Sequence, residues 1–209
     1  MRTLRRLIAM LLGAAYVVAF LSGVGCSTPP TPPPPEHEAA GFQLFESPQA
    51  DPLRLSPDGT VLYSALTTMG RVRVITTANL IAVATIEVGI DPVSVALRPD
   101  GSELWVANHV SDSVSVISLA PGASQYKVVE TIQSVDAANL ITDFDEPVDI
   151  AFANNDKAYV ALSSRNRIAI VDANSYAVTG FLAMNAQEPR AMRVRNGFLG
   201  NVPFVVELG

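Results

Sequence analysis

Apolar and polar residues alternate over short stretches between residues 52 and 184, and this pattern predicts β-strands rather than helices. The clearest stretch runs from Pro92 to Ile132. Its alternating residues are typical of a sheet that packs against a neighbour on each face. The segment Pro99-Asp100-Gly101 predicts a turn, because proline presets φ and glycine accepts a positive φ. The stretch therefore predicts one four-stranded antiparallel sheet, with strands over Val93–Leu97, Glu103–Ala107, Ser113–Ser118 and Lys127–Ile132.

The same pattern recurs along the chain, and each copy opens with an acidic residue followed by proline. The prolines are 40, 55 and 42 residues apart, at Asp51-Pro52, Asp91-Pro92, Glu146-Pro147 and Glu188-Pro189. Strand-containing repeats of this period indicate the blades of a β-propeller. We therefore expect an all-β fold, a β-propeller of four-stranded antiparallel blades. About three blades and the start of a fourth are present, beginning near residues 51, 91, 146 and 188.

A short motif on the second strand of each copy carries a family resemblance. It occurs as Trp105-Val106-Ala107-Asn108, as Tyr159-Val160-Ala161-Leu162 and, more weakly, as Tyr63-Ser64-Ala65-Leu66. These residues resemble the YVTN family of β-propeller repeats, which is related to surface-layer and lactonase-like propellers. The resemblance extends from about Asp51 to Arg193. It implies the fold and says little about chemistry, because function depends on a site rather than on a fold.

The second copy departs from the period through two additional segments, Pro121–Gln125 and Ser134–Asp145. Both segments are predicted to be loops around the fourth strand of that blade. Within the longer one, Ala137–Ile141 has the composition of a helical turn. The extra residues therefore lengthen the period without changing the blade.

The tail departs from the pattern more strongly. The first strand of a fourth copy is predicted at Pro189–Val194, and Asn196-Gly197 is predicted to form the turn that follows it. Pro203 then falls where the second strand should run, where it would remove a donor from the sheet. A propeller closes with about 4–8 blades. We therefore expect an incomplete ring, either because the chain is truncated or because it closes by self-association.

The first 26 residues read as an export signal. Arg2, Arg5 and Arg6 precede an apolar run over residues 7–24, which is shorter than most membrane-spanning helices. Ser22–Cys26 resembles a bacterial lipobox, although Gly23 stands where leucine is usual. The resemblance implies lipid attachment at Cys26. The alternatives are an ordinary cleaved signal or an uncleaved apolar anchor.

The chain therefore divides into a lipoprotein-type signal peptide at 1–26, a proline-rich linker at 27–50 and propeller repeats at 51–209. Prolines keep the linker extended and semi-rigid. Removing the three signal arginines from the net charge of −6 leaves −9 for residues 27–209. An acidic body argues against nucleic acid and anionic lipid as partners. We expect an exported lipoprotein facing the periplasm or cell surface, in the outer membrane, held through its lipid or apolar anchor.

One rim of the propeller carries the candidate binding residues. The connections between blades and the loops between second and third strands share this rim, so the four acids would surround the mouth of the channel. Converging carboxylates favour hard metal ions, whereas an acid before proline is also common turn chemistry, and we assign no metal. The candidate ligand rim is Asp51, Asp91, Glu146, Glu188, Asn108, His109 and Arg165, with Ser111, Asp112, Ser163, Ser164 and Asn166 nearby.

Motifs for common catalytic chemistry are absent from the sequence. His37 and His109 are the only histidines, no Cys-x-x-Cys-His motif could attach haem, and no Gly-x-Ser-x-Gly elbow occurs. We assign no catalytic residue and no cofactor. The predicted function is a cell-envelope binding or scaffold module that presents its rim to a protein, peptide or surface polymer. Two alternatives stay open: the N-terminal propeller of a larger lactonase-like or haem-containing enzyme, and a truncated product without function.

Overall fold

The computed structural model describes residues 49–135, 142–185, 188–197 and 200–206, which all belong to one compact unit, Phe45–Gly209. The predicted signal peptide with Cys26, nearly all of the linker, and the helical turn proposed at Ala137–Ile141 lie outside the described residues. In the described part of the chain, no helix is both long and apolar enough to cross a membrane.

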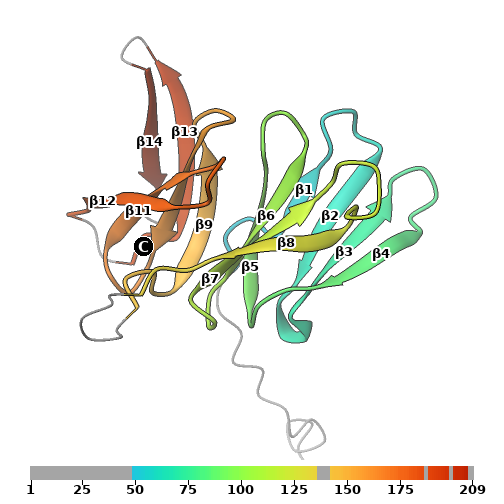
Figure 1. Ribbon diagram of the computed structural model, residues 1–209, viewed down its shortest axis with the longest axis horizontal. Coiled ribbons are helices and arrows are strands. Elements are labelled where there is room, and N and C mark those ends of the chain that lie inside the picture. The colour runs from blue at the N-terminus through green and yellow to red at the C-terminus, as the bar shows by residue number, and fades with distance from the viewer. Residues whose placement is uncertain (1–48, 136–141, 186–187, 198–199, 207–209) are drawn as a thin grey trace, which may run out of the picture. The chain divides into compact units, whose positions relative to one another are not determined.

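Three four-stranded antiparallel sheets follow one another along the chain (Figure 1). Within each sheet the strands lie in sequence order, so every connection is a simple turn between neighbours. Blade 1 also contains a short 3₁₀ helix at Thr67–Met69. The strands are β1 (Leu53–Leu55), β2 (Val61–Leu66), β3 (Arg71–Thr76) and β4 (Ala82–Glu87) in blade 1; β5 (Pro92–Leu97), β6 (Glu103–Asn108), β7 (Ser113–Ser118) and β8 (Lys127–Ile132) in blade 2; and β9 (Pro147–Phe152), β10 (Lys157–Leu162), β11 (Arg167–Asp172) and β12 (Val178–Ala183) in blade 3.

This architecture confirms the all-β prediction of four-stranded antiparallel blades. In the second copy, β7 and β8 have the predicted bounds, while β5 and β6 are each one residue longer than predicted. The predicted turn has its positive φ at Gly101, as the sequence requires. Local turn chemistry and strand periodicity were therefore sufficient to place these strands.

The tail differs from the prediction. β13 (Ala191–Gly197) runs through the expected Asn196-Gly197 turn and pairs with β14 (Gly200–Val206) as a two-stranded sheet. Pro203 lies within β14, opposite Val194. The strand forms despite the donor that proline removes, because β14 pairs only with β13 among the described residues and an edge strand tolerates a missing N–H.

Hydrophobic layers between successive blades form the core. The first layer lies between blade 1 and blade 2. It contains Tyr63, Ala65, Val72 and Val74 of blade 1 and Val95, Leu104, Val106 and Ile117 of blade 2. The opposite face of blade 2, including Trp105 and Val116, packs with Val160, Leu162 and Ala169 of blade 3. A third, smaller layer joins Tyr159 and Ala161 of blade 3 to Met192 of β13. Blade 2 is therefore buried on both faces, as its apolar pattern predicts.

Blade 1 presents one apolar face that has no such neighbour among the described residues. Leu55 is 53% exposed, whereas the residues at the same position of the next two blades, Val95 and Ile150, are 0% and 2% exposed. Leu53 is similarly exposed, at 51%. The same blade sequence pattern is thus buried or exposed according to whether a preceding blade covers it.

The first strands of consecutive blades contact one another: β1 with β5, β5 with β9, and β9 with β13. Backbone hydrogen bonding contributes to the contact between blades 1 and 2. Asp51 and Ser94 form a parallel bridge, in which the Val95 N–H donates to the Asp51 carbonyl at 2.9 Å. Polar side chains on these four strands are therefore brought close together, although they lie far apart in the sequence.

Candidate functional site

The acidic residues before the blade prolines have a specific backbone role. Asp91, Glu146 and Glu188 adopt positive φ values of 61°, 50° and 50°. The carbonyl of Asp91 accepts from the N–H of His109, and that of Glu146 accepts from the N–H of Ser163, at 2.9 and 3.0 Å. Each of these two acids therefore closes its first strand onto the loop that follows the second strand.

The loops between second and third strands in turn hold the acids of the next blade. Asp112 Oδ1 accepts from the N–H of Glu146 at 2.9 Å, and Asn166 Oδ1 accepts from the N–H of Glu188 at 2.8 Å. Both acceptors also have positive φ, which asparagine and aspartate tolerate better than most residues. These bonds place the blade connections and the loops at one end of the sheets, the arrangement on which the predicted rim depends.

No three of the four predicted acids come together. The carboxylate of Glu146 accepts a hydrogen bond from the hydroxyl of Ser163 at 3.0 Å. Glu188 forms an ion pair with Arg190 at 3.0 Å. Asp51 forms ion pairs with arginines of the inner strands. Among the described residues no group of three or more histidine, cysteine, aspartate or glutamate side chains could hold a metal ion. The cation interpretation of this rim therefore has no support from its geometry.

The three other predicted rim residues have mainly structural partners. Asn108 is buried, and its Nδ2 donates to Ser113 and Ser115 Oγ at 3.1 and 2.9 Å. Arg165 Nε pairs with Asp145 Oδ2 at 3.0 Å. His109 Nδ1 is covered and accepts no hydrogen bond from the described residues. The structure thus places these side chains on one rim without aiming them at a common point.

A second cluster lies on the inner strands and was not predicted. The residues two positions after the first three blade prolines are Arg54, Ser94 and Asp149, and all three are polar within otherwise apolar strands. Asp149 is 0% exposed, and its Oδ1 accepts from Ser94 Oγ at 2.7 Å and from the Ile150 N–H at 2.9 Å. Its Oδ2 accepts from the Met192 N–H at 2.6 Å. One carboxylate therefore joins β5, β9 and β13.

Burial raises the pKa of Asp149 above its ordinary value, since a charged carboxylate loses hydration inside the protein. The hydrogen bonds from Met192, Ser94 and Ile150 and the nearby charge of Arg193 oppose this shift. The group is thus held by donors on both oxygens yet remains easier to protonate than a surface aspartate.

Arg54 and Arg193 converge on a different carboxylate, that of Asp51. An Nη2 of Arg54 lies 2.5 Å from Asp51 Oδ2, and an Nη2 of Arg193 lies 3.5 Å from the same oxygen. Nη1 of Arg193 is also 3.5 Å from Asp149 Oδ2. Two guanidinium groups from the first and fourth blades therefore meet at one rim residue.

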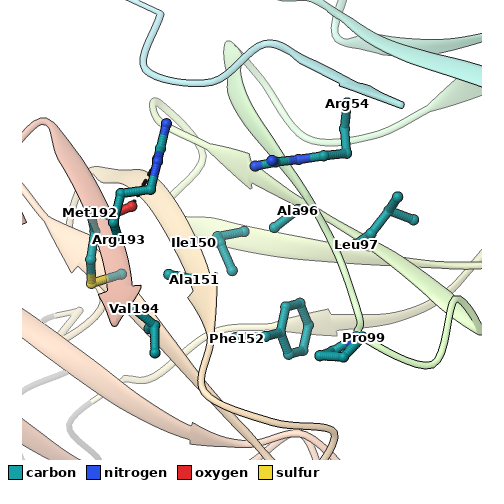
Figure 2. Close-up of a pocket in the computed structure, with 10 residues that line it drawn as sticks. All are labelled: Arg54, Ala96, Leu97, Pro99, Ile150, Ala151, Phe152, Met192, Arg193 and Val194. Atoms are coloured by element: carbon teal, nitrogen blue, oxygen red, sulfur yellow. Dashed lines mark hydrogen bonds between the residues drawn. The ribbon is translucent and has the colours of Figure 1, made fainter. Parts of the chain in front are cut away.

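A pocket of about 240 Å³ lies beside these arginines. Figure 2 shows Arg54 and Arg193 at one end, with Phe152 and Pro99 at the other. The remaining lining residues are apolar: Ala96, Leu97, Ile150, Ala151, Met192 and Val194. The pocket thus has arginines at one end and a hydrocarbon wall.

Sequence reasoning missed this cluster although a signal was present. Arg54, Ser94 and Asp149 occupy the same register position of consecutive copies, and a charged residue there is unusual in an inner strand. Arg193 gave no such signal, because its approach to Asp51 depends on how the fourth strand packs against the third.

Solved structures with a similar fold are β-propeller proteins. Hydrazine synthase of Kuenenia stuttgartiensis matches with a TM-score of 0.58 and 23% identity, over 73% of this chain and 41% of that one. The Cps50 (Swd1) β-propeller domain of Myceliophteria thermophila matches with a TM-score of 0.56 and 13% identity, over 74% and 53%. A proposed 6-phosphogluconolactonase of Bacteroides uniformis matches with a TM-score of 0.55 and 19% identity, over 67% and 45%.

Neither the protein-family models nor the curated proteins gave a match to this chain. The chain spans about half or less of the length of the solved structures it resembles. At these identities the likeness concerns the fold alone. The chain has the fold of a β-propeller, with three four-stranded blades and the first strands of another.

Proposed function

We propose that this protein is a YVTN-type binding module of the cell envelope, whose ligand engages the rim around Asp51 and the adjoining inner-strand pocket. The observation that carries the proposal is the pocket itself, in which two arginines face an apolar wall. The YVTN assignment is supported by the in-register Trp105-Val106-Ala107-Asn108 and Tyr159-Val160-Ala161-Leu162 motifs. The ligand is a protein, peptide or surface polymer.

Binding is tested by sedimentation with envelope fractions of the producing cells, using the full chain with Cys26→Ala so that a lipid cannot retain it. We expect the Cys26→Ala protein to sediment with the envelope. We expect it to stay in solution when Arg54→Gln and Arg193→Gln are both added. Arg190→Gln is the matched control, because Arg190 pairs with the exposed Glu188 and does not line the pocket. Equal retention of both variants would contradict the proposed binding surface.

We further propose that the module is tethered through a lipid on Cys26 and lifted from the membrane by the proline-rich segment Ser27–Glu36. Lipid chains contribute about 0.8 kcal/mol per buried methylene, so multiple acylation holds a protein on a membrane. Mass spectrometry of the wild-type chain is expected to show acylated Cys26. Palmitate labelling that persists in Cys26→Ala would refute the tether.

The alternative is that these blades are the N-terminal propeller of a larger enzyme, either a lactonase-like hydrolase or a haem-containing redox protein. It is supported by the partial coverage, since the chain corresponds to 41–53% of the similar solved structures. Sequencing the DNA downstream of Gly209 in all frames tests it. A Cys-x-x-Cys-His motif would favour the redox protein, while further plain blades would favour binding. Absence of turnover in a lactone-hydrolysis assay of the complete protein would exclude the lactonase-like alternative.

A further inference from the structure

A second pocket, of about 300 Å³, lies between blades 1 and 2. Blade 1 contributes Glu87, Val88 and Gly89, where its fourth strand ends and the connection to blade 2 begins. Blade 2 contributes the remaining lining residues, which are Ser111, Ser113, Ser115, Val128 and Thr131. None of these residues lines the pocket beside Arg54 and Arg193, so the two pockets are separate.

The space arises because blade 2 has a small side chain where the other blades have a large one. The third strand begins with Ser113 in blade 2, but with Arg71 in blade 1 and Arg167 in blade 3. In blade 3 the arginine fills this position, because its guanidinium lies 3.9 Å from the centre of the Phe181 ring and pairs with Asp143 at 2.9 Å. Serine is too short to do the same, so the corresponding space in blade 2 stays open.

The serine hydroxyls of this pocket have more protons to donate than acceptors to receive them. Ser113 and Ser115, which are 2% and 3% exposed, both accept from Asn108 Nδ2, at 3.1 and 2.9 Å. Ser111 Oγ accepts from the N–H of Ile90 at 3.0 Å and shares one hydrogen bond with Ser113 Oγ at 3.0 Å. Only one of the three serine protons is therefore used, and the described residues provide no acceptor for the other two. Buried donors without an acceptor cost free energy, so the pocket favours a ligand that brings acceptor oxygens.

The exposed side of the same pocket offers an acceptor. The side chain of Glu87 is 81% exposed, and its Oε1 accepts from Arg71 at 2.9 Å, while its Oε2 has no partner among the described residues. This oxygen can accept from a hydroxyl of the ligand. No arginine or lysine is among the lining residues that the structure describes, so the pocket favours a neutral ligand over an anion. Val88 and Val128 add apolar contact surface.

The volume limits the ligand to one small ring. About 300 Å³ corresponds to about ten water molecules at about 30 Å³ each. A pyranose sugar combines the required groups in this size, because its oxygens accept, its hydroxyl protons donate and its C–H groups contact apolar side chains.

We propose that the pocket between blades 1 and 2 binds one neutral pyranose residue. Its oxygens accept from Ser113 and Ser115, one of its hydroxyls donates to Glu87, and its C–H groups lie against Val88 and Val128. This inference goes beyond the proposed binding surface at the rim and is independent of it, because the two pockets share no lining residue.

Ligand-observed NMR titration of the full chain carrying Cys26→Ala tests the proposal. The probes are glucose, galactose and mannose, each as the free sugar and as its methyl glycoside. We expect saturable binding of at least one sugar, and much weaker binding of cyclohexanol, which lacks the other hydroxyls, and of glucuronate, which carries a charge. Methyl glycosides that bind as tightly as free sugars would identify a residue of a glycan as the ligand, whereas binding of the free sugars alone would identify a monosaccharide.

Two variants locate the site. Ser115→Val is expected to abolish binding, because it removes a donor and fills the pocket. Glu87→Ala is expected to weaken binding by about ten-fold, the usual effect of losing a hydrogen bond to a charged group. Ser118→Ala is the matched control, since Ser118 is also buried on β7 but does not line the pocket.

Three outcomes would overturn the proposal: no saturable binding of any of the sugars, equal binding of cyclohexanol or glucuronate, or equal weakening by Ser118→Ala. Fluorescence of Trp105 monitors folding of every variant. If Ser115→Val does not fold, Glu87→Ala decides alone, because its side chain is exposed and unchanged affinity would contradict the site. Absence of sugar binding together with intact envelope retention would reject this site and leave the proposed binding module standing.

Discussion

At the scale of single residues, Asp149 shows how a buried acid can organise neighbouring blades. Its two oxygens accept from Ser94 of blade 2, from its own strand at Ile150, and from Met192 of β13. Burying a charged or polar group costs free energy unless its hydrogen bonds are made. The carboxylate is tolerated here because every oxygen has a donor, and the donors come from three separate strands.

Asp149→Asn is expected to destabilise the protein by about 1–3 kcal/mol, the usual cost of leaving a buried hydrogen-bonding group unpaired. Asparagine offers one acceptor oxygen, so its NH₂ group must face either Ser94 and Ile150 or Met192. Urea unfolding measures the change. Asp156→Asn, at an exposed turn, should have little effect. Equal unfolding midpoints for the two variants would show that the three-strand contact is not formed.

Tyr176 provides a pH-dependent test at the same scale. Burial, together with its hydrogen bond to Glu103 at 2.7 Å, raises the pKa of Tyr176 to about 12. The native state therefore keeps this proton longer than the unfolded chain, whose tyrosines titrate near about 10. The stability gained from the bond is fully present below pH 10 and is lost as pH rises from about 10 to about 12.

Ultraviolet titration of phenolate formation is expected to show late-titrating tyrosines in the native protein. Burial also raises the pKa of Tyr63 to about 12. Tyr176→Phe should therefore remove one late-titrating group and leave that of Tyr63. A native titration in which all tyrosines ionise near pH 10 would refute the buried Tyr176–Glu103 contact.

At the scale of elements, the connections between blades depend on residues that accept unusual backbone conformations. Asp112 and Asn166 combine a positive φ with a side-chain bond to the next connection. Blade 1 has Gly70 in the corresponding turn, where φ is 59° and the backbone carbonyl accepts from Val88, as the carbonyl of Asn166 accepts from Met184. The three turns therefore share the backbone conformation, while only Asp112 and Asn166 add a side-chain bond to the next connection.

Gly89 makes the connection between blades 1 and 2 sensitive to a single methyl group. A Cβ there would lie 2.3 Å from Ser111 Oγ and 2.6 Å from Asn108 Cγ. Asn108 cannot easily move, because it is buried and bonded to two serines. Gly89→Ala is therefore expected to cost about 1–3 kcal/mol through overpacking.

Thermal or urea unfolding of Gly89→Ala gives the measurement, with Gly180→Ala as its control. A Cβ at Gly180 would contact only Ile170 Cδ1, at an ordinary 4.0 Å, so that variant should match the wild type. If both alanine variants unfold alike, the close approach of the blade connection to Asn108 is contradicted.

At the scale of the whole molecule, a polar network joins blades 2 and 3 through Glu103. Glu103 accepts from the indole N–H of Trp105 at 2.8 Å and from the Tyr176 hydroxyl, and it pairs with Arg98 at 3.2 Å. Arg98 also donates to the carbonyl of Ala173 at 3.0 Å. Trp105 also packs against Phe152 of blade 3, with ring centroids 5.0 Å apart.

Glu103→Ala is expected to destabilise the protein by about 3–5 kcal/mol, because it removes a buried carboxylate partner of Arg98 and leaves the buried Trp105 N–H without its acceptor. Trp105 is the only tryptophan, so its fluorescence reports the blade 2–blade 3 interface directly. Glu130→Ala, on the exposed strand β8 of the same blade, is the control. Comparable destabilisation by the two variants would show that the network does not join the blades.

Local sequence patterns are sufficient to specify the blades. Strand alternation, the Pro-Asp-Gly turn and the repeated acid-proline step are local properties, so they predict β5 to β8 and the three-blade register. The strand that contains Pro203 shows what local patterns leave open. Whether proline interrupts a strand depends on whether that strand has a neighbour on both sides, and sequence does not contain that information.

The positions of the polar side chains relative to one another depend on how the blades pack. The four acids predicted to surround one opening are separated by their own backbone bonds and local partners. Asp149, Arg54 and Arg193, which come from three different blades, meet because the inner strands pack in succession. Repeat periodicity specifies each blade through contacts close in sequence, whereas a site between blades depends on distances that only the assembled sheets determine.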